Sequence, residues 1–207
     1  MMLIFLVRHG ESEGNRDNKF RGRVDFPLTD IGIAQANDLK DFLKNFEFEI
    51  IVSSPLKRAL QTAQPIADLK KIEVKKDEHF NNISLGPWEN LTKDFVEKNF
   101  PKEWEIWKKT PEYLEVEGME KLDDVMERSK KRLKELAKVS KGNILVVTHR
   151  AVLKPLIAGI LGIEKPYFWK IHFDPASTTI FEYKDENFML KNLNINHYLK
   201  HNPSEYF

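Results

Sequence analysis

The stretch that decides the fold is Leu3-Ile4-Phe5-Leu6-Val7-Arg8-His9-Gly10-Glu11-Ser12. Its unbroken apolar run is typical of a strand that is buried on both faces of a parallel sheet. The run stops at Arg8 and His9, and a buried strand has no use for these two side chains at its exit. Open α/β sheets bind ligands at the carboxyl ends of their strands. The stretch therefore predicts an anion site, because an arginine can hold an oxyanion and a histidine can attack it. Gly10 would let the backbone come close to the ligand.

Strands and helices are predicted to alternate along the rest of the chain. Apolar runs predict strands at residues 2–7, 49–52, 72–76, 143–148, 170–183 and 188–195. Helical spacing and capping residues predict helices from Thr29-Asp30 to Phe46, after Pro55, from Lys121 to Lys138 and from Ala151 to Leu161. This order predicts an α/β fold, a three-layer sandwich with a mainly parallel central sheet.

Two segments depart from this alternation. Residues 10–28 are polar and interrupted by glycine and proline, so they are predicted to form a long functional loop. Residues 77–118 contain three prolines and three of the four tryptophans, which predicts an insertion of short helices. A length of 207 residues is long for one domain and short for two. We therefore expect a single domain over residues 1–207 with a helical insertion at about 77–118.

Composition limits the classes of partner. The 33 basic and 32 acidic residues give a net charge of +1, which indicates no whole-protein attraction to nucleic acid or membrane. The chain has no cysteine, which excludes disulfides and thiolate chemistry. No apolar stretch approaches the roughly 18 residues of a membrane helix, and no basic region precedes the first apolar run. We expect a cytoplasmic protein, and we leave a homodimer open.

Three of the predicted strand exits carry matching chemistry. The first gives Arg8-His9, the second leads through Ser53-Ser54-Pro55 to Arg58, and the third gives His149-Arg150. Because the carboxyl ends of parallel strands lie on one edge, these side chains are expected to converge. Two imidazoles with two or three guanidiniums suit an anion with several oxygens, most simply a phosphate.

Simpler interpretations exist for each residue alone. A histidine before glycine is often a turn residue, an arginine on a helix is often a surface charge, and His149 could cap a helix. Their joint appearance at three strand exits favours a site. A metal site is disfavoured because His9 and His149 each have an arginine neighbour, which repels a dication, and no His-Glu-x-x-His pattern occurs. A nucleotide-binding P-loop pattern is also missing, so we expect neither metal nor cofactor.

Taken together, these motifs resemble the histidine phosphatase superfamily, in the branch of cofactor-dependent phosphoglycerate mutase, the phosphatase half of fructose-2,6-bisphosphatase and alpha-ribazole phosphatase. The resemblance runs in order from residue 3 to about residue 162. It is carried by Leu6-Val7-Arg8-His9-Gly10-Glu11-Ser12, Asn15, Pro27-Leu28-Thr29-Asp30-Ile31-Gly32 with Gln35-Ala36, Ser53-Ser54-Pro55-Leu56-Lys57-Arg58-Ala59 with Thr62-Ala63, and Val147-Thr148-His149.

The resemblance implies a phosphoglycerate mutase-like fold and a role for each matching residue. It implies that His9 is the nucleophile that forms a phosphohistidine and that no metal is needed. It further implies that Arg8, Arg58 and His149 are catalytic residues of the phosphate pocket. Substrate-binding roles are implied for Gly10, Ser12 and Asn15 in the loop after the nucleophile. They are also implied near the substrate mouth for Gly22 and for Arg21, which replaces a usual glutamine.

One position departs from the family pattern. The family usually has a glutamate that protonates the leaving oxygen where this chain has Asn82. General acid catalysis is typically worth about 10²–10⁴-fold in rate, and an asparagine cannot supply it. Three interpretations stay open. In the first, another acid substitutes, from the set Glu11, Glu78, His79 and Glu89. In the second, the substrate has a good leaving group, as in an acyl phosphate or phosphoanhydride. In the third, the chain is a weakly active or non-catalytic phosphate-binding subunit.

The sequence thus predicts a metal-independent phosphatase that hydrolyses a small phosphorylated metabolite through phospho-His9. A cofactor-dependent phosphoglycerate mutase is the alternative, although full mutases carry a longer insertion than residues 77–118. Arg150 is predicted either to contact a carboxylate or second phosphate of the substrate or to be a solvated charge at a helix start.

Overall fold

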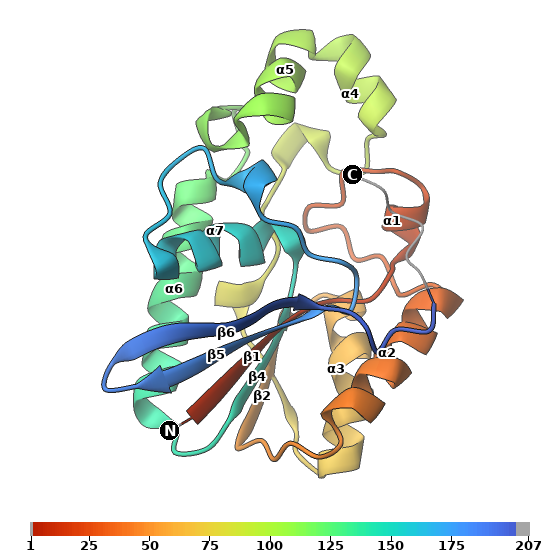
Figure 1. Ribbon diagram of the computed structural model, residues 1–207. Coiled ribbons are helices and arrows are strands. Elements are labelled where there is room, and N and C mark those ends of the chain that lie inside the picture. The colour runs from red at the N-terminus through yellow and green to blue at the C-terminus, as the bar shows by residue number, and fades with distance from the viewer. Residues whose placement is uncertain (1, 202–207) are drawn as a thin grey trace.

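A computed structural model describes residues 2–201 of the chain. Its centre is a six-stranded sheet with the strand order β3-β2-β4-β1-β5-β6 (Figure 1). The strands are β1 (Met2–Arg8), β2 (Ile50–Ser53), β3 (Val74–Lys76), β4 (Ile144–Thr148), β5 (Thr178–Lys184) and β6 (Asn187–Ile195). The first four are parallel to one another, and β5 joins β1 in the antiparallel direction. The predicted α/β fold with a mainly parallel sheet is confirmed.

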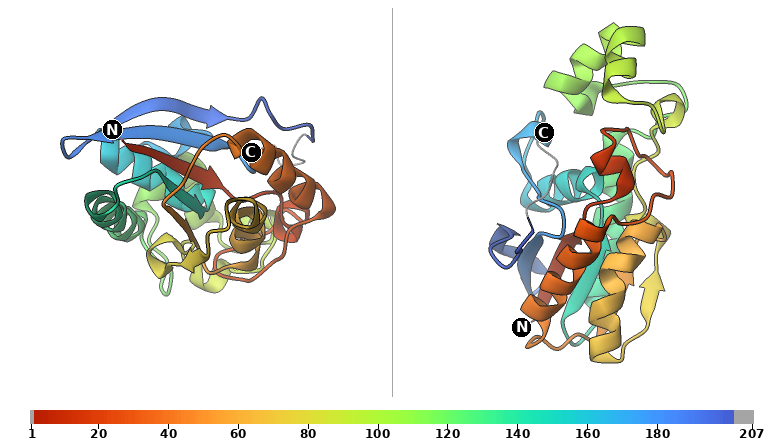
Figure 2. Two further views of the ribbon diagram at one scale, coloured as in Figure 1. Left: turned by 90° about the horizontal axis from the view of Figure 1, so that it is seen from below. Right: turned by 90° about the vertical axis from the view of Figure 1, so that its right-hand side faces the viewer.

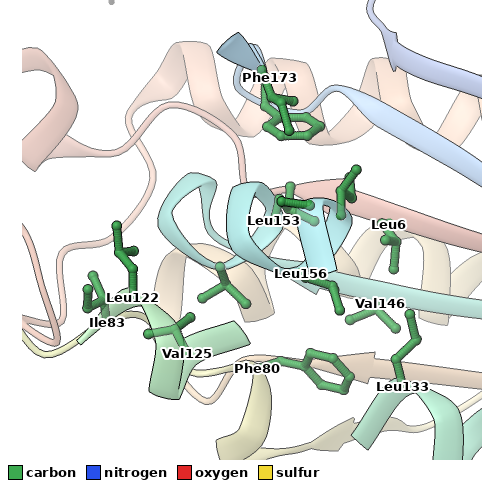
Figure 3. Close-up of a cluster of buried hydrophobic side chains, with 14 of the residues drawn as sticks. Leu6, Phe80, Ile83, Leu122, Val125, Leu133, Val146, Leu153, Leu156 and Phe173 are labelled. Atoms are coloured by element: carbon green, nitrogen blue, oxygen red, sulfur yellow. The ribbon is translucent and has the colours of Figure 1, made fainter. Parts of the chain in front are cut away.

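Helices cover both faces of the sheet, which gives three layers (Figure 2). On one face α2 (Asp30–Leu43) and α3 (Lys57–Lys70) pack on Phe5 and Val7 of β1. On the other face α6 (Leu122–Val139) and α7 (Arg150–Leu161) pack in a cluster with Ile4 and Leu6. Successive strand residues point to opposite faces, so an apolar run is what a strand between two helical layers requires. Figure 3 shows part of the second cluster, with Leu6, Val146 and Leu153 among its members.

The segment between β3 and α6 consists of short helices, as the sequence predicted. They are η1 (Glu78–Phe80), η2 (Gly86–Trp88), α4 (Lys93–Asn99), α5 (Pro101–Lys109) and η3 (Pro111–Tyr113). Figure 1 places α4 and α5 beyond the carboxyl edge of the sheet. Trp88 and Trp107 pack on Phe20, with ring centroids 5.0 and 5.3 Å apart. Phe20 belongs to the loop after β1, so the tryptophans of this segment share their core with that loop.

The predicted loop at residues 10–28 was wrong in one respect, because it contains a helical turn, α1 (Glu13–Arg16). Ser12 and Asn15 bond to each other at its start: the backbone N–H and the hydroxyl of Ser12 both donate to Oδ1 of Asn15, at 3.1 and 2.6 Å. The side chain of Asn15 thus satisfies a backbone donor at the helix start that has no partner inside the helix.

Two element boundaries also differ from the prediction. The strand expected from residue 170 begins only at Thr178, after η4 (Phe168–Lys170) and a turn in which Ser177 donates to the carbonyl of Asp174. Pro175 has no N–H for a strand ladder, and Ala176 has a φ of 56°, so this stretch turns instead of extending. Phe46, expected on the first long helix, lies beyond its end and packs on Phe5 at 4.8 Å.

Candidate active site

Three parallel strands bring four titratable side chains to one edge of the sheet. Arg8 is the last residue of β1, His9 follows it, and His149 follows β4 at the start of α7. Arg58 lies in the first turn of α3, after β2. The rings of His9 and His149 have centroids 5.0 Å apart. All four side chains are buried, with exposed fractions between 0 and 2 %.

His9 is held so that one ring nitrogen can act as a nucleophile. Its Nδ1 lies 2.6 Å from the carbonyl oxygen of Gly10. A carbonyl only accepts hydrogen bonds, so Nδ1 carries the proton and Nε2 of the neutral ring carries the lone pair. Burial, and then the positive charges of Arg58 and Arg8, hold the pKa of His9 well below its usual 6.5. The ring is therefore neutral at neutral pH.

His149 is neutral for similar reasons. Burial, and then the charge of Arg58, hold its pKa well below 6.5. Its Nε2 lies 2.7 Å from Oγ of Ser54, and its buried Nδ1 has no partner among the described residues. When the Ser54 hydroxyl donates to Nε2, Nδ1 carries the proton and can donate to a bound oxyanion.

Arg58 is a buried cation that carbonyl oxygens hold in place. Its Nη1 donates to Val24 at 2.8 Å and its Nη2 donates to Gly22 at 2.9 Å, while Nε has no partner within residues 2–201. Burial, and then the charge of Arg21, lower the pKa of Arg58 to about 9, so it stays protonated at neutral pH. Carbonyls orient a guanidinium without neutralising it, and the carboxylates of Asp25 and Glu89 offset only part of the charge of Arg58, because its pKa is still lowered. An anion bound beside Arg58 would offset more of it.

A pocket of about 620 Å³ opens over this cluster, within the size range of small-molecule sites. Of the predicted site residues, those that line it are His9, Asn15, Arg21, Gly22, Asn82, His149 and Arg150. Sequence reasoning missed the outer wall, which includes the aromatic residues Phe20, Trp104, Trp107, Phe168 and Trp169 and the basic residues Arg16, Lys19, Lys93 and Lys108. These residues come from four separate segments, so only the folded structure shows that they share a wall.

Four of the predicted site residues are not among those that line the pocket: Arg8, Arg58, Gly10 and Ser12. Gly10 packs against α2, where an added Cβ would lie 2.8 Å from the carbonyl oxygen of Gly32. A glycine is therefore needed at position 10 for the close approach of two backbone segments, and the approach of Gly10 to a ligand stays a prediction. Ser12 is fully buried and donates to Asn15, which lines the pocket; a substrate contact of Ser12 stays a prediction.

None of the four acids suggested as substitutes at Asn82 lines the pocket. Oε1 of Glu89 accepts the backbone N–H groups of Leu85 and Arg23, each at 3.0 Å. The remaining three bond elsewhere: Glu11 to Thr29, Glu78 to Asn81, and His79 to Asp77. Among the described residues that line the pocket, Asp94 is the only carboxylate, and it lies exposed on α4.

Within residues 2–201, no group of three or more His, Cys, Asp or Glu side chains is arranged to hold a metal ion. In the same range, no helix has the length and apolar character to cross a membrane.

Comparison with known proteins agrees with this geometry. The family model of the histidine phosphatase superfamily, branch 1, matches residues 4–196. The chain belongs to the histidine phosphatase superfamily. It is therefore a phosphatase of the histidine type, a phosphomonoesterase acting on small phosphorylated substrates.

Similar proteins span nearly the whole length of the chain. Phosphoserine phosphatase 1 of Hydrogenobacter thermophilus is 32% identical over 196 residues, covering 94% of this chain and 93% of that protein. Adenosylcobalamin/alpha-ribazole phosphatase of Escherichia coli is 28% identical over 196 residues, covering 93% and 96%. The solved structure of Bacillus stearothermophilus YhfR, 27% identical, superposes with a TM-score of 0.90 and covers 96% of this chain and all of that one.

Proposed function

We propose that the protein hydrolyses phosphate monoesters of a small metabolite in two steps through a phosphohistidine at His9. In the first step Nε2 of His9 attacks phosphorus, and the bond to the leaving oxygen breaks. In the second step water attacks the phosphohistidine and the P–N bond breaks, which returns the electron pair to Nε2 and releases phosphate. Division into two displacements is ordinary covalent catalysis.

The observation that carries this proposal is the orientation of His9. Its Nδ1 proton is engaged by Gly10, so the lone pair is on Nε2, and its lowered pKa keeps that lone pair free at neutral pH. Among the described residues, Nε of Arg58 and Nδ1 of His149 have no hydrogen-bond partner. These donors suit the charge on the three equatorial oxygens during phosphoryl transfer.

A second candidate function rests on Asn82. An asparagine in place of a proton donor would suit a weakly active or non-catalytic subunit that binds phosphorylated ligands. The arrangement of His9 and Arg58 does not separate this function from the first, because both need a phosphate pocket. Activity measurements do separate them.

The first test is turnover of p-nitrophenyl phosphate, whose leaving group needs little help from an acid. We expect turnover by the unaltered protein and its loss in His9→Ala. His79→Ala is the matched control, because His79 lies outside the pocket with a side chain 56% exposed, and it should retain activity.

The result also separates the alternatives. No turnover of p-nitrophenyl phosphate or of any phosphorylated metabolite at any pH would overturn the phosphatase proposal and favour a binding subunit. A mutase would require priming by 2,3-bisphosphoglycerate, so phosphate transfer between positions of phosphoglycerate that depends on this compound would favour the mutase alternative.

A further inference from the structure

Asn82 is oriented to accept a hydrogen bond inside the pocket. Its Nδ2 donates to the carbonyl of Gly22 at 2.8 Å, which fixes the amide because a carbonyl cannot donate. The remaining atom, Oδ1, is buried and has no partner in the described part of the chain. The whole residue is 7% exposed and lies in the pocket wall. Oδ1 can therefore hold the O–H of a water or a substrate, but it cannot give or take a proton.

Few described residues of the site could replace a carboxylic acid at position 82 as the proton donor. Among the described residues that line the pocket, Asp94 is the one carboxylate, and it lies on α4, which Figure 1 places beyond the carboxyl edge of the sheet. His149 is held neutral, with its pKa well below 6.5. Arg58 stays protonated, since even its lowered pKa of about 9 lies above neutral.

The charge of the pocket favours a leaving group that departs as an anion. Among the described residues that line it are six basic side chains, Arg16, Lys19, Arg21, Lys93, Lys108 and Arg150, and one carboxylate, Asp94. Fixed positive charge around a developing anion stabilises it without moving a proton. An alkoxide is too basic to leave without being protonated, whereas a phenolate, an enolate, a carboxylate or a phosphate can leave as an anion.

We propose that Asn82 restricts this enzyme to substrates whose leaving group departs unprotonated, namely aryl, enol and acyl phosphates and phosphoanhydrides. The inference rests on the proposed phosphohistidine reaction and names its substrate class. In the first step the N–P bond to His9 forms, the P–O bond breaks, and the electron pair leaves on the departing oxygen. In the second step the proton of the attacking water ends on the released phosphate, so neither step needs an acid from the protein.

The test is a series of substrates that share the phosphoryl group and differ in the leaving group. We would measure kcat/KM for p-nitrophenyl phosphate, phenyl phosphate, acetyl phosphate, phosphoserine and glycerol phosphate. We expect p-nitrophenyl and acetyl phosphate to exceed the two alkyl phosphates by at least about 10²-fold, the lower bound for general acid catalysis. This comparison needs no variant, so it decides the proposal even where a substitution impairs folding.

Two variants of Asn82 then assign the effect to this residue. Asn82→Glu supplies a proton donor and should raise kcat/KM on alkyl phosphates by about 10²–10⁴-fold, with a much smaller change on p-nitrophenyl phosphate. Asn82→Gln introduces a side chain of nearly the same size as glutamate but without an acidic proton, so it should not raise turnover of alkyl phosphates.

Each result has a defined meaning. Turnover that depends on His9 but is within about tenfold for alkyl and aryl phosphates would overturn this inference and leave the phosphohistidine reaction standing. Equal gains from Asn82→Glu and Asn82→Gln would also overturn it. Turnover of no substrate, or turnover that survives in His9→Ala, would instead overturn the proposed function.

Discussion

A serine hydroxyl orients the second histidine of the site. Oγ of Ser54 lies 2.7 Å from Nε2 of His149 and also accepts the backbone N–H of Leu56 at 3.4 Å. The hydroxyl has one proton, and when it donates this proton to Nε2, Nδ1 of His149 carries the ring proton and can donate to a bound oxyanion. The side chain acts as a positioning residue for the oxyanion donor.

Ser54→Ala should lower kcat/KM on p-nitrophenyl phosphate by about tenfold to a hundredfold, since a lost buried hydrogen bond costs about 1–3 kcal/mol. The inhibition constant of inorganic phosphate should rise as well, because the same Nδ1–H would contact the bound anion. Ser53→Ala is the control: Ser53 is equally buried, and its hydroxyl donates to the carbonyl of Ser54 and not to His149. Similar losses in the two variants would show that Ser54 has only a packing role.

At the scale of residues, the sequence located the cluster but not its supports. Arg8, His9 and His149 were predicted because apolar runs end at them, and that signal is local. The partners that hold them were not predictable: Arg8 donates through Nη1 to the carbonyl of Phe173 at 2.7 Å. Every residue has a backbone carbonyl, so no sequence pattern marks the one that a side chain will use.

At the scale of elements, Glu112 joins the helical segment to the chain after α7. It lies in η3, is 7% exposed, and accepts the backbone N–H groups of Tyr167 and Phe168 through Oε1. Phe168 in turn packs on Trp107 at 5.7 Å, and both rings line the pocket. The outer wall of the pocket therefore depends on a contact between two segments 55 residues apart.

Glu112→Ala should lower the free energy of unfolding by at least about 1–3 kcal/mol, the cost of leaving one buried donor without an acceptor. Urea denaturation measures this. Glu105→Ala provides the comparison, because Glu105 is on the exposed side of α5 with Lys108 and Lys109 as its partners, and its loss should leave the urea midpoint nearly unchanged. An unaltered urea midpoint in Glu112→Ala would contradict a stabilising role for this contact.

The elements themselves were largely predictable, for a physical reason. Strands buried between two helical layers are apolar on both faces, and the helices that cover them are amphipathic, so both leave strong patterns. The predicted elements were wrong at places where local hydrogen bonds determine the backbone conformation. Capping by Ser12 and Asn15 makes a helical turn in a polar loop, and the turn at Asp174 to Ser177 delays β5. The single-domain organisation over residues 1–207 stays a prediction.

At the scale of the whole molecule, burying two neutral histidines makes stability depend on pH. The pKa values of His9 and His149 lie well below 6.5 in the folded state and near 6.5 in the unfolded chain. As the pH falls below 6.5, the unfolded chain takes up protons that the folded protein does not. The stability that these histidines contribute is therefore present above pH 6.5 and is lost below it.

The free energy of unfolding should fall between pH 7 and pH 5.5 by up to about 1.4 kcal/mol per pH unit for each of the two histidines. Asp77 and Asp174 also have lowered pKa values. Their contribution to stability is lost only at lower pH, as the pH falls through the range in which carboxylates are protonated. Urea titrations at several pH values measure the slope. A flat profile from pH 7 to 5.5 would contradict the neutral, buried state of His9 and His149.

The proposed reaction requires that His9 carries the phosphoryl group during turnover. To detect this intermediate, the protein is mixed with p-nitrophenyl phosphate and quenched in alkali, where phosphohistidine is stable, and the modified residue is mapped by tandem mass spectrometry. We expect an acid-labile phosphoryl group on His9 that forms and decays within the turnover time and does not appear in His9→Ala. Turnover without phosphorylated His9, or with the phosphoryl group on another residue, would contradict the proposed reaction.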